Sequence, residues 1–153
     1  IATSTGEVCA WGNNVHGLLG VEPRGGQSPR AVRIEGLTDI VQVAGGNDFA
    51  LARDADGHVW AWGRTVSGML GDGDSEDTST ASPQQVVGVA PMEWIGASGA
   101  SSYGIDRTGN LWAWGGGLRA APYAGEDRRP YRVPLPGPAQ SVSGGVVLLG
   151  PDG

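Results

Sequence analysis

Few side chains in this sequence have the chemistry that catalysis or metal binding requires. There are two histidines, His16 and His58, and one cysteine, Cys9. A catalytic triad needs a histidine oriented between nucleophile and acid, and the sequence contains no Gly-x-Ser-x-Gly elbow that would present a serine nucleophile. No group of Cys and His residues has the spacing of zinc ligands. The glycine run at 115–117 lacks the lysine and the following helix of a phosphate-binding loop. We therefore expect no enzyme activity, no metal site and no cofactor.

One acidic stretch partly matches a calcium-binding loop. Such a loop needs carboxylates at its positions 1, 3 and 5, glycine at 6 and glutamate at 12. Asp72, Asp74 and Glu76 fit the first three positions. The other two positions do not fit, because Asp77 and Pro83 stand there. The favoured interpretation is a solvated acidic loop.

The charge of the chain argues against direct binding of nucleic acid. The formal net charge is −6 and the pI is about 4.7, whereas proteins that bind phosphate backbones present basic surfaces. The Arg-rich segment Arg119–Arg132 is expected to be a solvated loop, with a partner-binding patch as the alternative. All ten basic residues are arginine, and the chain is rich in Ala, Gly, Pro and Val. This composition indicates a bacterial genome of high GC content.

Composition also limits the fold class. The 153 residues suffice for one domain with a core, and the 28 glycines and 10 prolines are too many for a helical protein. We therefore expect an all-β fold with many turns.

No apolar run reaches the roughly 18 residues of a membrane span. We expect a soluble protein, cytoplasmic or secreted, with no membrane partner. The chain begins at Ile1 rather than Met, and is interpreted as part of something longer.

A short motif occurs three times, with a period of about 51 residues. Its copies are GEVCAWG at Gly6–Gly12, GHVWAWG at Gly57–Gly63 and GNLWAWG at Gly109–Gly115. Each copy is followed by a Pro-x-x-Val landmark, at Pro29–Val32, Pro83–Val86 and Pro130–Val133. A third landmark is an apolar run that ends in small residues, at 41–46, 94–99 and 140–145. Three landmarks in a constant order indicate a repeat protein.

Each repeat is predicted to form four short antiparallel strands. In the second repeat these strands are expected at Ile40–Gly46, Phe49–Arg53, His58–Gly63 and Gln84–Val87. Four strands in about 50 residues are typical of one blade of a β-propeller.

The third strand of the repeat indicates how the blades are arranged. In the second repeat, Val59 and Ala61 point to one face and Trp60 and Trp62 to the other. Both faces are apolar, so the sheet is expected to lie between two similar sheets. Cys9 stands where the later repeats have tryptophan, and we expect it to be a small buried filler.

These features resemble the regulator of chromosome condensation repeat. The resemblance rests on the WAWG strand, the GLLG or GMLG that follows it, the Pro-x-x-Val landmark and the VQVAGG run, and it covers essentially the whole chain. The family forms β-propellers, typically of about seven blades. Its members bind proteins, for example in nucleotide exchange on a small GTPase or in inhibition of β-lactamase. The chain departs from the family pattern at Leu18 and Met69, where glutamine is favoured, and at Phe49 and Ser102, where histidine is favoured.

The repeats divide the chain into two complete blades and two partial ones. The expected boundaries are 1–37, 38–89, 90–137 and the start of a further blade at 138–153. Because about three repeats cannot close a ring, two arrangements are open. Either the chain is a segment of a larger propeller, or several copies form a homo-oligomer that completes one.

Recognition is expected on one rim of the propeller. The loop between the first two strands and the loop after the third strand reach the same edge, and loops on a rigid scaffold commonly carry function. The candidate rim residues are Asn13, Asn14, His16, Asn47, Asp48, Arg64, Ser67 and Ser101. The constant residues between them are assigned to the scaffold, with Trp11 packed between blades and Gly12, Gly17 and Gly20 permitting a tight path.

The favoured function is therefore a non-catalytic scaffold for protein–protein interaction that binds an unidentified protein partner through this rim. The alternative is a structural or engineered propeller fragment that assembles into a ring without a specific ligand.

Overall fold

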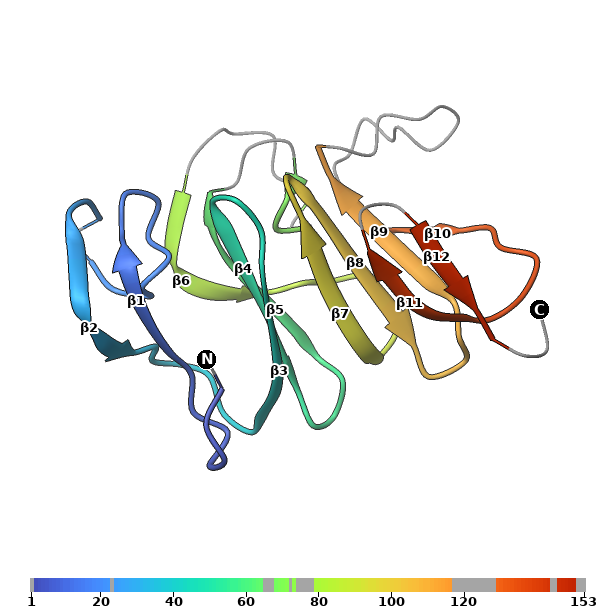
Figure 1. The fold of residues 1–153 in the computed structure, drawn as a ribbon, viewed down its shortest axis with the longest axis horizontal. Coiled ribbons are helices and arrows are strands. Elements are labelled where there is room, and N and C mark those ends of the chain that lie inside the picture. Colours follow the sequence, from blue (N-terminus) through green and yellow to red (C-terminus); the bar gives the residue numbers. More distant parts are fainter. Residues whose placement is uncertain are drawn as a thin grey trace.

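The computed structural model describes residues 2–22, 24–64, 68–71, 73, 79–116, 129–143 and 146–150. Their regular structure consists of strands (Figure 1). The strands are β1 (Cys9–Asn13), β2 (Gln27–Arg33), β3 (Ile40–Gly45), β4 (Phe49–Asp54), β5 (Val59–Arg64), β6 (Ser79–Gln85), β7 (Met92–Ser98), β8 (Ser101–Asp106), β9 (Leu111–Gly115), β10 (Tyr131–Val133), β11 (Ala139–Ser143) and β12 (Val146–Leu149). None of the described residues forms a helix long and apolar enough to cross a membrane.

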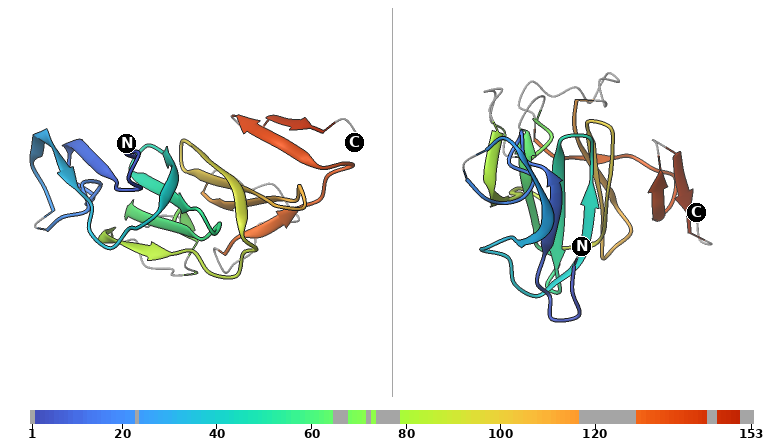
Figure 2. Two further views of the ribbon diagram at one scale, coloured as in Figure 1. Left: turned by 90° about the horizontal axis from the view of Figure 1, so that it is seen from below. Right: turned by 60° about the vertical axis from the view of Figure 1, so that its left-hand side comes forward.

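These strands form antiparallel sheets that follow one another along an arc (Figures 1 and 2). Two sheets are complete, with the spatial orders β3-β4-β5-β6 and β7-β8-β9-β10. The pair β1–β2 precedes them and the pair β11–β12 follows. Strand β7 contacts both β3 and β11, so the first strands of successive sheets lie side by side. The all-β fold of four-stranded propeller blades is confirmed.

The sheets stack face to face, as the two apolar faces of the third strand predict. Val59 and Ala61 of β5 pack in one core cluster with Trp114 of the next sheet. Trp62, on the other face of β5, packs in a second cluster with Val8 of the preceding sheet. Burial of an aromatic side chain of this size stabilises a fold by about 2–3 kcal/mol. The repeated tryptophans therefore hold neighbouring sheets together.

The fourth strand of the second repeat differs from the prediction. In the second repeat it was expected at Gln84–Val87, but β6 spans Ser79–Gln85 and contains Pro83. The pairing of β6 with β5 shifts register between Ala61 and Gly63, which marks an irregularity opposite this segment. A proline lacks the N–H that a central strand needs and is tolerated on an edge strand or at a bulge. The landmark proline therefore lies inside the outer strand in β2 and β6, and directly precedes it in β10.

A turn at the lower edge of the arc precedes the third strand of each repeat, and we call these the lower turns (Figure 1). The last residue of each lower turn is a glycine, and it joins one sheet to the next. In all three repeats its carbonyl oxygen accepts a hydrogen bond from the main chain of the following sheet: Ile40 N–H to Gly6 (3.1 Å), Met92 N–H to Gly57 (2.8 Å) and Ala139 N–H to Gly109 (2.8 Å). A Cβ atom at Gly57 would lie 2.7 Å from the oxygen of Met92. Glycine is required here because the turn of one sheet touches the backbone of its neighbour.

Trp11 does not pack between blades, contrary to the prediction. Val8 and Ala10 of the first sheet face the second sheet, so Trp11 points to the opposite face. No described element covers that face, and Trp11 is 59% exposed. Cys9 shares the face and is half-buried rather than fully buried.

Candidate functional site

The predicted rim is the upper edge of the arc in Figure 1. We use "upper rim" for residues 13–22, 24–26, 46–48, 64, 68–71, 99–101 and 115–116. Main-chain hydrogen bonds join its turns within and between sheets. Arg64 N–H donates to the oxygen of Asp48 at 2.8 Å, and Asn47 N–H donates to the oxygen of Gly99 in the next sheet at 3.0 Å. These bonds hold the turn at Asn47 and Asp48 to β5 and to the next sheet.

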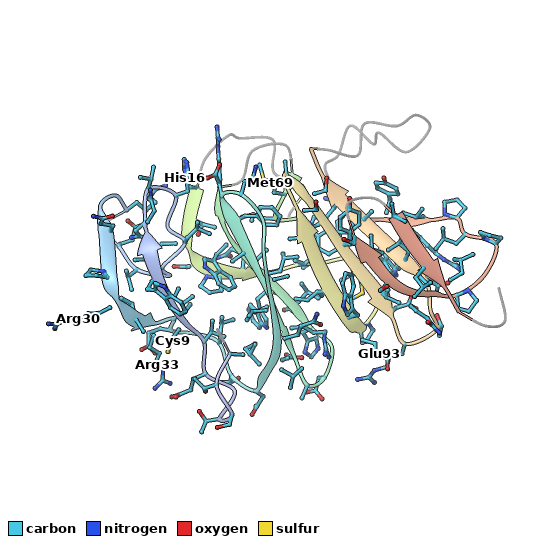
Figure 3. The ribbon with its side chains drawn as sticks, viewed as in Figure 1. Cys9, His16, Arg30, Arg33, Met69 and Glu93 are labelled. Atoms are coloured by element: carbon cyan, nitrogen blue, oxygen red, sulfur yellow. The ribbon has the colours of Figure 1, made fainter. Side chains whose placement is uncertain are left out.

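Five of the predicted residues reach solvent on the upper rim. Asn13 and Asn47 are exposed, and His16, Asp48 and Arg64 are half-buried. The structure brings Asp48 and Arg64 together, with 3.5 Å between Oδ2 and Nη1. Such a solvated ion pair contributes little to stability. Asn13 is the last residue of β1, and His16 lies on the loop that follows, in the sheet before the one that carries this pair. Figure 3 shows His16 at the upper edge.

Asn14 is not available to a partner, contrary to the prediction. It is only 3% exposed. Its Oδ1 accepts a hydrogen bond from Leu19 N–H at 2.9 Å, and its Nδ2 donates to the oxygen of Val21 at 3.0 Å. A buried amide that satisfies main-chain groups within its own loop organises that loop. Asn14 therefore belongs to the scaffold.

Ser101 is also buried, at 4% exposure, because it begins β8 and pairs with Gly115 of β9. The prediction that it is offered to a partner is wrong. Ser67 lies outside the described residues. So do Asp72, Asp74 and Glu76 of the acidic stretch and most of the segment Arg119–Arg132.

The loop after β1 also makes hydrogen bonds to the second sheet. Trp62 Nε1 donates to the oxygen of Leu18 at 3.0 Å, and Arg24 Nη1 donates to the oxygen of Ser79 at 2.6 Å. A Cβ atom at Gly17, where φ is +81°, would lie 2.8 Å from the Cα of Ala81. This close approach explains the constant glycine of the motif.

At the next boundary a different side chain makes the corresponding contact. Ser102 Oγ donates to the oxygen of Met69 at 2.9 Å, and Figure 3 shows Met69 at the upper edge. Trp114 is the counterpart of Trp62, and among the described residues its buried Nε1 has no hydrogen-bond partner. The two departures from the family pattern, Met69 and Ser102, therefore contact each other.

Sequence reasoning missed the polar residues that shape the lower turns. Asp106 is buried and accepts hydrogen bonds from Asn110 Nδ2, from Thr108 and from Trp112 Nε1, the last at 3.0 Å. Burial opposes ionisation, but the hydrogen bonds from Trp112, Asn110 and Thr108 outweigh it and hold the pKa of Asp106 well below its usual range.

Asp54 has the same place in the second repeat and accepts hydrogen bonds from the main chain and the ring of His58, at 2.9 and 3.0 Å. Burial again opposes ionisation, and the bonds from His58 lower the pKa of Asp54. The spacing Asp-x-x-Gly at Asp54–Gly57 and Asp106–Gly109 was the signal that could have revealed both residues. The lower edge thus uses its carboxylates to form turns. In the part of the chain that the structure describes, no three His, Cys, Asp or Glu residues are grouped as metal ligands would be.

Comparison with known proteins places these features in a family. The model of the regulator of chromosome condensation (RCC1) repeat matches residues 5–53 and 56–104, and a second model of that repeat matches residues 40–68. Human HERC6, a probable E3 ubiquitin-protein ligase, is 36% identical over 114 residues, which are 72% of this chain and 11% of HERC6.

Two solved structures have the same fold. Human WBSCR16 superimposes with a TM-score of 0.74 at 24% identity, over 87% of this chain and 34% of that one. Prp20p from Saccharomyces cerevisiae, a protein with binding properties to Gsp1p and histones, superimposes with a TM-score of 0.74 at 18% identity. The match covers 88% of this chain and 36% of Prp20p, so the chain spans about a third of these propellers. Because the repeat models match more than half of its residues, and its sheets form an arc of propeller blades, the chain belongs to the regulator of chromosome condensation repeat family.

Proposed function

We propose that this chain is a non-catalytic scaffold whose upper rim binds a protein partner. The observation that carries the proposal is that polar side chains of two neighbouring sheets reach solvent together on the upper rim. On the lower edge, Asp54 and Asp106 are engaged in their own turns. On the upper rim, Asn13 and Arg64 at the ends of β1 and β5 and Asn47 in the turn after β3 reach solvent. Asn13 Oδ1 also accepts a hydrogen bond from Val15 N–H, and Arg64 pairs with Asp48. Exposed polar groups beside a turn that main-chain hydrogen bonds hold in place suit recognition of another protein.

The relatives support a binding role without identifying the partner. Prp20p has the same fold and binds two kinds of protein, Gsp1p and histones. The present chain is acidic overall, with a net charge of −6, which favours a protein partner over nucleic acid. We also propose repeat units at 1–37, 38–89, 90–137 and 138–153, because the described strands of each sheet fall within one of these ranges.

Affinity capture with two matched triple variants tests the proposal. The rim variant carries Asn13→Ala, Asn47→Ala and Arg64→Ala. The control variant carries three substitutions of exposed lower-edge residues, Asp56→Ala, Glu93→Ala and Arg107→Ala. A partner captured from an extract of the source cells by the unmodified chain is expected to be retained by the control variant and lost by the rim variant. Loss from the control variant alone, or retention by both variants, would contradict the proposal. Near-ultraviolet circular dichroism of the tryptophans verifies that both variants are folded.

A further inference from the structure

A side chain bridges the first strands of two neighbouring sheets. Gln42 of β3 reaches the main chain of Ile95 in β7, where its Nε2 donates to the carbonyl oxygen at 2.8 Å and its Oε1 accepts from the N–H at 3.0 Å. Both main-chain groups of Ile95 therefore point out of their own sheet, toward β3. A primary carboxamide satisfies both of them, because it carries an acceptor and a donor side by side.

The next boundary has the same main-chain groups but lacks the bridge. Val142 of β11 pairs with Val147 in the second pair after a register shift, which is also the place of Ile95 in the third sheet. Because hydrogen-bonded and non-hydrogen-bonded pairs alternate, the N–H and the carbonyl of Val142 also point out of their sheet, toward β7. At the position of Gln42, β7 carries Trp94, which has no carboxamide. Among the described residues, no side chain bonds the main chain of Val142.

These unbridged groups border a hollow between β7 and β11. Val142 is only 8% exposed, and buried main-chain groups are almost always paired in native structures. The ring of Trp94 forms an apolar wall of the hollow, because it lies over Gly96, where a Cβ atom would come within 2.2 Å of it. The hollow measures about 300 Å³, and its walls include the small residues Ala44, Gly96, Ala97, Ser98 and Ser143. One water molecule takes up about 30 Å³, so the hollow has room for a side chain.

We propose that this hollow binds a primary carboxamide, the glutamine side chain of a protein partner. Its oxygen accepts from the N–H of Val142 and its NH₂ group donates to the carbonyl of Val142, as Gln42 does for Ile95, while its methylenes pack against Trp94. A carboxylate could not donate and an ammonium group could not accept, so the arrangement selects a carboxamide. Strands β7 and β11 contact each other directly, so no further sheet stands between them. The site goes beyond the proposed function, because it uses the first strands of the sheets and not the upper rim.

Hydrogen exchange of the Val142 amide tests whether its main chain is open toward β7. Trp94→Gln places a carboxamide at the position of Gln42, and is expected to slow the exchange of this amide by about tenfold. Trp94→Phe is the matched control, because it also removes the indole but adds no carboxamide, and it should not slow the exchange. Equal exchange rates of the Val142 amide in the two variants would overturn the proposal.

Titration with two short peptides, followed by the NMR signal of the Val142 amide, tests the ligand. The probes are acetyl-Gly-Gln-Gly-amide and acetyl-Gly-Met-Gly-amide, which share a main chain and have side chains of similar length. Only the glutamine peptide is expected to give a saturating shift of this signal. The shift should persist in Trp94→Phe and be lost in Trp94→Gln, whose own carboxamide fills the site. Equal shifts with both peptides would assign binding to the peptide main chain. That result, no shift with either peptide, or a shift that persists in Trp94→Gln would overturn the proposal.

Discussion

The indole nitrogen of Trp62 donates a hydrogen bond to the carbonyl oxygen of Leu18 at 3.0 Å, across the boundary between the first two sheets. At the next boundary, the corresponding Trp114 is buried without a hydrogen-bond partner for Nε1 among the described residues, and Ser102 bonds Met69 instead. One position of the repeat therefore keeps its packing role while its polar contact changes. This difference allows the hydrogen bond to be separated from the packing.

Replacing each of these tryptophans with phenylalanine measures that hydrogen bond. Trp62→Phe and Trp114→Phe remove a similar apolar area from buried interfaces, but only the first leaves a carbonyl without its partner. We expect Trp62→Phe to lower the free energy of unfolding by about 1 kcal/mol more than Trp114→Phe. Urea unfolding followed by circular dichroism measures both. Equal losses would show that the bond to Leu18 contributes nothing.

The glycine of the lower turns is expected to be needed for contact between sheets, and not for its backbone angle alone. Gly57 and Gly88 both have positive φ, of 95° and 77°. A Cβ atom at Gly57 would approach the oxygen of Met92, whereas nothing lies within 4 Å of one at Gly88. Gly88→Ala should lower the free energy of unfolding by about 1 kcal/mol through backbone strain. Gly57→Ala should lower it by clearly more, and thermal unfolding measures both variants. A smaller loss for Gly57→Ala than for Gly88→Ala would contradict the role of Gly57 in the contact between sheets.

The carboxylate of Asp106 is expected to make stability fall in acid. Its pKa is lowered in the folded state, while the unfolded value is about 3.9. The stabilisation is therefore complete at neutral pH and is lost as the pH falls below about 4 toward the folded pKa.

Asp106→Asn tests this prediction. At pH 7 the variant should unfold more easily than the unmodified chain, and the difference should shrink below about pH 4. Asp56→Asn, at an exposed turn position, is the control and should have little effect at either pH. A difference that stays constant from pH 7 to pH 3 would assign the effect to something other than this ionisation.

The side chain of Gln42 acts as a strand partner between sheets. Its Nε2 donates to the oxygen of Ile95 at 2.8 Å, and its Oε1 accepts from the N–H of the same residue at 3.0 Å. Gln42→Leu leaves both main-chain groups of Ile95 without this partner, and should cost about 2 kcal/mol. Gln85→Leu, on the exposed outer strand, should cost less than about 0.5 kcal/mol. Chemical unfolding of the two variants gives the comparison, and equal costs would argue against the bridge.

The inner strands were predictable because their residues are apolar on both faces. The expected Ile40–Gly46, Phe49–Arg53 and His58–Gly63 agree with β3, β4 and β5 within one residue at each end. The outer strand was misplaced because it is polar and contains Pro83, so its pattern resembles a loop. Its place depends on pairing with β5, which local sequence does not encode.

The rim was predictable as an edge but not residue by residue. Strand alternation puts both kinds of loop at one end, which places Asn47 and Arg64 together there. The burial of Asn14 depends on the path of its loop, and the burial of Ser101 on its pairing with Gly115. Neither contact produces a pattern that can be recognised in the local sequence. The partner and the bacterial origin stay predictions.

The central claim, that the upper rim is the binding surface, is tested most directly by hydrogen exchange of the chain with and without its captured partner. We expect slower exchange of backbone amides at residues 13–17, 46–48 and 64 in the complex, with residues 54–58 and 106–110 unchanged. Protection confined to the lower turns, or to β1 and β12 at the ends of the arc, would contradict the claim.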